Sequence, residues 1–255
     1  MKKQLAILIL LGFCASAYAG SPILINSYRF AAATATPSPT ETPTPTPSGG
    51  PQLVQQKIGT TASGDLTITL DTDTTPGNVL TVCVAYNNSD DISTISTIEN
   101  TDSFVSQASV GSAAIATGLW SLTAVRSDSG IMIHPVTGIT RITANVQEWS
   151  GLSSSTAEDA HFDSSGSFNS TVLAGVDIPS SANNLAIACG GWVADDYSSG
   201  PTDSYVRLTP AGAGSIYLES AYLIQFSADP TSTTWSLSAG INWAAVTAVF
   251  GVTTP

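Results

Sequence analysis

The strongest candidate for a binding site is an aromatic and acidic segment in the second half of the chain. It contains Trp192, Asp195, Asp196 and Tyr197, with Gly and Ser residues around them. An aromatic ring packs on the apolar face of a sugar, and a carboxylate accepts hydrogen bonds from its hydroxyl groups. Because loops on a rigid scaffold commonly carry binding residues, we expect a ligand-binding loop here, with Trp192 as the stacking ring. The alternative is an aromatic side chain that folds back onto the edge of a sheet.

A pair of aspartates offers a candidate metal site. Asp71 and Asp73 flank Thr72 in a turn-like segment. Ca²⁺ takes about six to eight oxygen ligands, and an Asp-x-Asp turn supplies some of them while backbone carbonyls supply others. The segment does not match a complete calcium loop. Asp71 and Asp73 are therefore candidate ligands of a structural Ca²⁺, with an ordinary solvated turn as the alternative, and no other cofactor is expected.

Residues that could perform catalysis form no recognisable set. The two histidines, His134 and His161, lie in different segments, and no Gly-x-Ser-x-Gly sequence marks an activated serine. Glu148 and Glu219 lie in strand-like runs, and a pair of carboxylates could cleave a glycosidic bond. With 19 acidic residues in the chain, such pairs arise by chance. We predict no catalytic residue and expect a protein that is not an enzyme.

The composition indicates a folded, acidic, exported protein. Of 255 residues, 42% are hydrophobic and 10% are charged, and the formal net charge is −12. Such a charge repels phosphate backbones and anionic membrane surfaces, so no nucleic-acid partner is expected. The first residues, with Lys2 and Lys3 before an apolar run, are typical of a signal peptide cleaved after Ala19. No later apolar run has the roughly 20 residues that a membrane-spanning helix needs, so the mature form is expected not to insert.

The rest of the chain divides into a spacer and one domain. Repeated Thr-Pro steps between residues 35 and 50 disfavour helix and sheet and favour an extended, disordered spacer. From Pro51 onward, apolar and polar residues alternate with the period of a strand, and no run has helical spacing. We therefore expect a signal peptide (1–19), an N-terminal segment with the Thr/Pro-rich spacer (20–50), and one β-sandwich domain (51–255).

Strand-like runs within this domain predict two stacked antiparallel sheets, as in a jelly roll. Turn-forming residues separate these runs. The runs after the one at 66–70 cover 79–86, 119–125, 131–134, 139–149, 171–178, 185–192, 216–226, 233–238 and 243–250.

The domain also shows a loose internal repeat. The segment from Asn78 to Gly151 is similar to the segment from Asn184 to Gly251: each has an apolar strand, an Asp-rich loop, a middle strand and a late strand that ends in an aromatic residue. Neither half could bury its apolar face alone, so we expect one sandwich with pseudo-twofold topology.

Two cysteines remain after removal of the signal peptide, and each lies in one of the repeated apolar runs. A disulfide is allowed in an exported protein, whereas a buried thiol behaves as a small hydrophobic side chain. If Leu80 is aligned with Leu185, Cys83 matches Ala188, and the two sulfur atoms lie on opposite strand faces. We therefore expect Cys83 and Cys189 to be core thiols, with a disulfide as the alternative.

Several of these segments resemble an uncharacterised β-sandwich domain that recurs in secreted bacterial proteins and in phage structural or fibre-like proteins. The segments that carry the resemblance are Pro76–Val82, Trp120, Val146–Leu152, Asn184–Ala188 and Trp243–Val246 before Phe250. The resemblance implies a sandwich fold and associates no catalytic residue with these motifs.

Together these features predict a secreted or cell-surface module that recognises a glycan or another cell-surface ligand without enzymatic activity. The first alternative is a structural subunit of a virion or extracellular appendage, which would associate with copies of itself. The second is an extracellular glycoside hydrolase or polysaccharide lyase.

Overall fold

The computed structural model describes residues 50–87, 92–112, 114–136, 139, 141–157, 159–176, 184–193, 197–225 and 231–252. The predicted signal peptide and all of the predicted spacer except Gly50 lie outside the described residues. Within the described ranges every regular element is a β-strand, and every recorded strand pairing in the three sheets is antiparallel. The predicted all-β antiparallel sandwich is confirmed. No helix in this part of the chain is long and apolar enough to cross a membrane.

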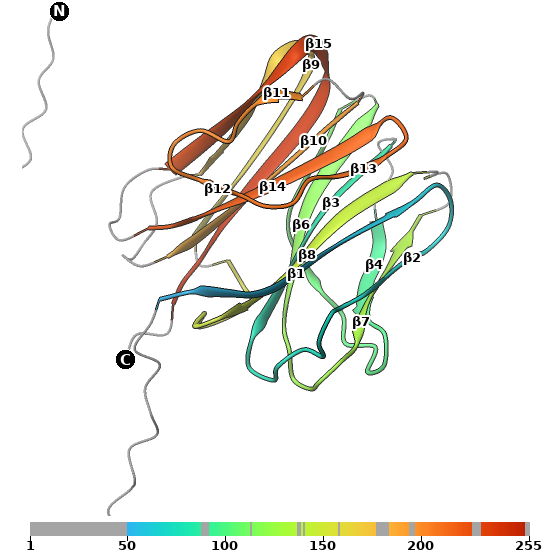
Figure 1. The fold of residues 1–255 in the computed structure, drawn as a ribbon, viewed down its shortest axis with the longest axis vertical. Helices are drawn as coiled ribbons and strands as arrows, with labels where there is room; N and C mark the ends of the chain where they lie inside the picture. Colours follow the sequence, from blue (N-terminus) through green and yellow to red (C-terminus); the bar gives the residue numbers. More distant parts are fainter. Residues whose placement is uncertain are drawn as a thin grey trace, which may run out of the picture. The chain divides into compact units, whose positions relative to one another are not determined.

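Three sheets make up the domain (Figure 1). The five-stranded sheet has the order β1 (Gln52–Thr61), β8 (Ile142–Ser150), β3 (Val79–Asn87), β6 (Ile115–Thr123) and β5 (Val105–Gly111). The seven-stranded sheet has the order β11 (Tyr197–Ser199), β15 (Thr231–Phe250), β10 (Leu185–Val193), β14 (Ile216–Ile224) and β12 (Val206–Arg207), with β13 (Ala211–Ala213) beside β14 and β9 (Asp159–Val176) beside β15. The three-stranded sheet has the order β2 (Leu66–Thr69), β7 (Gly130–Pro135) and β4 (Ile92–Thr97).

The five-stranded sheet is covered on both faces, which explains why its central strands are apolar throughout. In β3, Val82 and Val84 pack in one cluster with residues of the three-stranded sheet, such as Ile133. The alternate residues Cys83 and Ala85 pack in a second cluster with the seven-stranded sheet. Strands buried on two faces lose the apolar and polar alternation of a half-exposed sheet.

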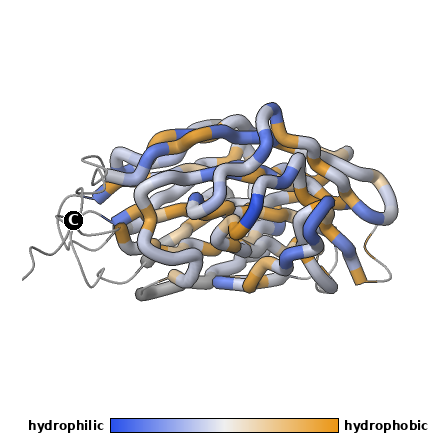
Figure 2. The backbone as a smooth tube through the Cα atoms, turned by 90° about the horizontal axis from the view of Figure 1, so that it is seen from below, coloured by the Kyte–Doolittle hydropathy of each residue, from blue (hydrophilic) through white to orange (hydrophobic). Residues whose placement is uncertain are grey.

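The seven-stranded sheet is covered in the same way. Its inner face contributes Ile187 and Val246 to the core that it shares with the five-stranded sheet. Its outer face packs against the second half of β9 and the first half of β15, which contribute Val172 and Trp235 to a third cluster. Figure 2 shows hydrophobic segments in orange interspersed with polar ones along the backbone. The domain thus has a central sandwich with a cover on each outer face.

The pseudo-twofold repeat is visible in the pairing of the central strands. The first residue of β3, Val79, pairs with Thr123 of β6 and Trp149 of β8. The first residue of β10, Leu185, pairs in the same way with Ile224 of β14 and Phe250 of β15. The residues before them repeat one contact: the Asn78 oxygen accepts a hydrogen bond from Ala124 N, and the Asn184 oxygen accepts one from Gln225 N, each at 2.8 Å.

The prediction of two core thiols is wrong, because Cys83 and Cys189 form a disulfide with a Cα–Cα distance of 5.7 Å. The pairing above aligns Val79 with Leu185, one residue away from the alignment on which the prediction rested. In the observed register the two cysteines occupy equivalent positions. Each points into the core between the two large sheets, so their side chains meet.

Candidate functional site

The predicted binding loop begins inside a strand. Trp192 is the eighth residue of the nine-residue strand β10, and it is 2% exposed. The interpretation of Trp192 as an exposed loop residue is therefore wrong, because pairing with Tyr217 and Trp243 holds it within the sheet. Asp195 and Asp196 lie outside the described residues. Tyr197 begins β11, and its side chain is also outside the description, so the proposed contribution of these three side chains stays a prediction.

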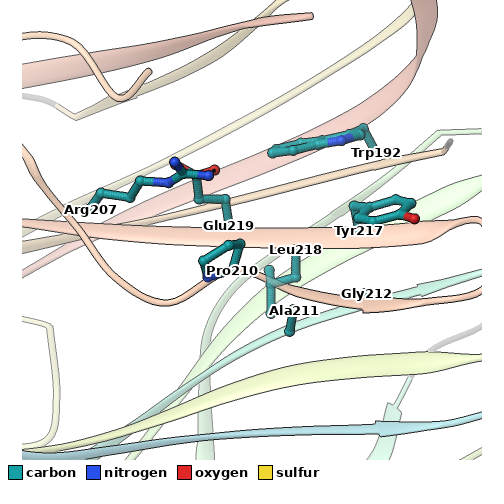
Figure 3. Close-up of a pocket in the computed structure, with 8 residues that line it drawn as sticks. All are labelled: Trp192, Arg207, Pro210, Ala211, Gly212, Tyr217, Leu218 and Glu219. Carbon is teal, nitrogen blue, oxygen red and sulfur yellow. Dashed lines mark hydrogen bonds and ion pairs between the residues drawn. The ribbon is translucent and has the colours of Figure 1, made fainter. Parts of the chain in front are cut away.

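A pocket of about 250 Å³ lies beside Trp192 on the outer face of the seven-stranded sheet (Figure 3). Strand β14 contributes Tyr217, Leu218 and Glu219. Beside β14 runs the edge segment, residues 206–213, which consists of β12, β13 and the residues between them, and it contributes Arg207 and residues 210–212. In the view of Figure 3, the rings of Trp192 and Tyr217 lie at one end and Arg207 reaches Glu219 at the other. The pocket therefore has an aromatic end and a charged end.

The pocket lies where the pairing of the edge segment with β14 is interrupted. Strand β12 pairs with β14 up to Arg207 opposite Ala221, and β13 resumes the pairing at Ala211 opposite Leu218. Three residues of the edge segment thus face two residues of β14, one of which is Glu219. The segment includes Pro210, which has no N–H to donate to the ladder. The edge strand bulges at this point, beside the Glu219 side chain.

The charged end is a buried carboxylate with two donors. Glu219 is 0% exposed; its Oε2 accepts a hydrogen bond from Arg207 Nη2 at 2.8 Å, and its Oε1 accepts one from Trp235 Nε1 at 3.0 Å. Burial raises the pKa of the Glu219 carboxyl, against the lowering effects of the Arg207 charge and of the hydrogen bonds from Trp235 and Arg207. The Arg207 side chain is 40% exposed, so it links the buried carboxylate to the solvent side of the pocket.

The aromatic end depends on cross-strand neighbours. Trp192 and Tyr217 are directly paired on β10 and β14, so their side chains lie on the same sheet face. Tyr217 is in turn paired with Gly212 of β13. A Cβ atom at Gly212 would lie 2.7 Å from the Tyr217 ring, so the absence of a side chain there leaves room for the ring. Tyr217 is only partly buried, which makes it the better candidate for ring stacking.

At the position equivalent to Glu219, the other half of the repeat has a glycine. The pairing places Glu219 opposite Gly190, and Gly118 opposite Val84 at the matching position of the first half. A Cβ atom at Gly118 would lie 2.4 Å from the Trp120 ring, so this ring covers the glycine and fills the space. The same face that is closed by an apolar ring in one half therefore carries a charged pair in the other.

The remaining carboxylates of interest have structural contacts. Glu148 is buried, and it accepts hydrogen bonds from Gln55, from Thr75 N at 2.9 Å and from Asn78 Nδ2 at 2.6 Å. These contacts attach the turn before β3 to β8. Glu148 and Glu219 lie in different sheets, so the structure does not bring the two glutamates together as a catalytic pair.

The candidate metal ligands Asp71 and Asp73 have other partners. Asp71 forms an exposed ion pair with Lys57, and Asp73 Oδ2 accepts a hydrogen bond from Ser127 Oγ at 3.4 Å. Among the described residues, no three His, Cys, Asp or Glu side chains gather in a group that could hold a metal ion. The Ca²⁺ site stays a prediction.

Of the two histidines, His134 does not line the pocket. His134 Nδ1 lies 3.0 Å from Asp65 Oδ2 at the surface of the three-stranded sheet. The side chain of His161 is outside the description.

Sequence reasoning missed Arg207, Tyr217 and the edge segment. Arg207 belongs to a strand of two residues, which is too short to show a pattern. The local signals that could have indicated the pocket are the Pro210-Ala211-Gly212 interruption and the Tyr-x-Glu spacing of Tyr217 and Glu219. No family model, curated protein or solved structure matches the chain.

Proposed function

We propose that this protein is an exported, non-enzymatic surface module that recognises a glycan through the pocket between β10, β14 and the edge segment. The observation that carries the proposal is the combination of two aromatic rings, Trp192 and Tyr217, with the exposed Arg207 held by the buried Glu219 in one pocket. A sugar ring needs an apolar surface for its C–H face together with donors and acceptors for its hydroxyl groups.

The lining favours binding over hydrolysis. Glycoside hydrolases typically use two carboxyl groups about 5 to 9 Å apart across the scissile bond. Among the described residues that line the pocket, Glu219 is the one carboxylate. Both of its oxygen atoms already accept hydrogen bonds from the protein, so its evident role is to hold Arg207 in place.

The disulfide supports export. A disulfide between two buried cysteines is typical of proteins that fold in an oxidising compartment. The predicted signal peptide would bring the chain to such a compartment, and the Thr/Pro-rich spacer would hold the domain away from whatever anchors its N-terminus.

A structural subunit is the second candidate, supported by the two edge strands of the five-stranded sheet. Val54 and Ile58 of β1 and Val105 of β5 are 48%, 38% and 60% exposed. Exposed apolar residues on sheet edges favour pairing with other chains. If this is the function, the purified protein assembles into regular oligomers, and light scattering after gel filtration would detect them.

The experiment that tests glycan recognition is a glycan-array screen of the purified protein beside two variants. Tyr217→Ala removes the partly exposed ring, and Arg126→Ala removes an exposed arginine outside the pocket as a control. We expect the wild type and Arg126→Ala to bind the same glycans and Tyr217→Ala to lose most of the signal. Equal binding by all three proteins, or no binding by the wild type, would contradict the proposal.

A further inference from the structure

The size of the pocket limits the ligand to a small unit. Its volume of about 250 Å³ is below the ~300 Å³ at which ordinary small-molecule sites begin. Two of its lining side chains are almost closed to solvent, since Glu219 is 0% and Trp192 2% exposed, so the surface that a ligand can reach is smaller still. A site of this size accommodates one ring, whereas a long polymer needs an open groove that continues at both ends.

The charges at the polar end favour an uncharged ligand. Arg207 is held by an ion pair with the buried Glu219, so the end offers exposed N–H donors with little net charge. Hydroxyl oxygens accept hydrogen bonds from such donors. A ligand carboxylate would instead lie beside Glu219, in a protein whose formal net charge is already −12.

The aromatic end gives the ligand its orientation. Trp192 and Tyr217 are cross-strand neighbours, and Arg207 and Glu219 lie at the other end of the same pocket. A pyranose with its C–H face on the Tyr217 ring would direct hydroxyl groups towards Arg207. The rest of a glycan would then leave the pocket on the solvent side, where Arg207 is 40% exposed.

We propose that the pocket binds a single neutral sugar ring at the end of a glycan chain, with Tyr217 as the stacking surface and Arg207, held in place by Glu219, as the hydroxyl-binding group. This inference rests on the proposed function, and it narrows the ligand class from glycans in general to neutral terminal residues recognised end-on.

The test is a calorimetric series on the full-length purified protein. The probes are methyl glycosides of glucose, galactose, mannose and N-acetylglucosamine, their neutral homo-oligosaccharides up to hexamers, and the corresponding methyl uronosides. Arg207→Lys keeps the charge but loses the planar fork of donors, and Arg126→Ala is the matched control for an arginine outside the pocket.

We expect one neutral glycoside to bind, with an affinity that changes by no more than about twofold from monomer to hexamer because only the terminal ring is in contact. The matching uronoside should bind at least about tenfold more weakly, and Arg207→Lys should weaken binding by about tenfold while Arg126→Ala does not. An affinity that rises with each added unit, or a preference for the uronoside, would overturn this inference and leave glycan recognition intact. No binding to any neutral or acidic probe would overturn both.

Discussion

Cys83 and Cys189 occupy equivalent positions in the two halves of the sandwich, and their disulfide joins the central strand of one large sheet to the central strand of the other. Their Cα atoms lie 5.7 Å apart, and their sequence separation is 106. The bond crosses the core between the sheets, where both side chains are buried. It therefore links the two pseudo-symmetric halves through the core that they share.

Removal of this disulfide should cost substantial stability. A cross-link that closes a loop of about 100 residues restricts the unfolded chain, so Cys83→Ala/Cys189→Ala should lower the free energy of unfolding by about 3–5 kcal/mol. Chemical denaturation measures this change. Peptide mapping without reduction should also recover a peptide pair joined through Cys83 and Cys189. Reactive thiols at both positions in denatured, unreduced protein would contradict the bond.

Gly191 marks a second place where the two large sheets approach closely. A Cβ atom there would lie 2.3 Å from Thr117 Oγ1 and 2.8 Å from Ala85 Cβ on the facing sheet. Gly191→Ala should therefore force the sheets apart and destabilise the domain by about 1–3 kcal/mol. Gly50→Ala is the control, since no atom lies within 4 Å of its added Cβ. Equal melting temperatures for the two variants would show that the sheets are not packed in this way.

Asp128 should stabilise the fold above acidic pH. Its carboxylate accepts hydrogen bonds from Glu99 N and Asn100 N, each at 3.0 Å, and from Gly130 N at 3.3 Å. Burial alone would raise the pKa of Asp128, but backbone hydrogen bonds from Asn100, Gly130 and Glu99 hold it below its ordinary value. The stabilisation is therefore present above the unfolded pKa of about 3.9 and is lost as the pH falls through the lower folded value.

The variant Asp128→Asn should lose about 1–3 kcal/mol at neutral pH, because it leaves backbone donors with a weaker acceptor. The deficit relative to wild type should shrink as the pH falls below about 4. Asp73→Asn removes the same charge from an exposed position and serves as the control. Urea denaturation over this pH range gives the comparison, and identical profiles for the two variants would refute the role of Asp128.

Glu219 should give the opposite pH dependence. Burial raises the pKa of its carboxyl despite Arg207, so at pH values between the unfolded and the folded pKa the folded state binds more protons than the unfolded state. The contribution of Glu219 to stability is therefore complete below the unfolded pKa of about 4.3 and is lost as the pH rises through the higher folded value.

Glu219→Gln cannot ionise, so wild type should lose stability relative to this variant as the pH rises from about 4. Glu99→Gln makes the same substitution at an exposed position and serves as the control. The measurement is the difference in unfolding free energy at a series of pH values. A flat difference, or one of opposite sign, would mean that the carboxyl is not perturbed by burial as described.

The sequence predicted the strands that are buried on both faces better than those at the edges. The continuous apolar runs at 79–86 and 185–192 match β3 and β10 almost residue for residue. Strand β1 was missed because its sequence is polar and rich in glutamine, and its strand state depends on pairing with β8. The runs at 233–238 and 243–250 belong to one strand, β15. Between the two runs its register with β9 shifts, but the pairing resumes on both sides of the shift.

The candidate site could be predicted only in part. Trp192 was selected because an aromatic residue stood near aspartates, but its place is set by pairing within the sheet, which the sequence does not display. Glu219 was noticed as a carboxylate in a strand, yet its partners come from a two-residue strand and from Trp235 on the following strand, β15. Contacts of this kind depend on how the strands align, and no local pattern encodes them.

The most direct test of glycan recognition at this pocket is an NMR titration that follows the five tryptophan indole N–H signals of the protein. The probe is the neutral methyl glycoside that binds most tightly in the calorimetric series, and single Trp→Phe variants assign the signals. We predict that the signals of Trp192, which lines the pocket, and of Trp235, which donates to Glu219, shift on binding, while that of Trp149 in the core between the large sheets does not. Saturable binding that leaves the Trp192 and Trp235 signals unchanged would contradict the account and place the ligand elsewhere.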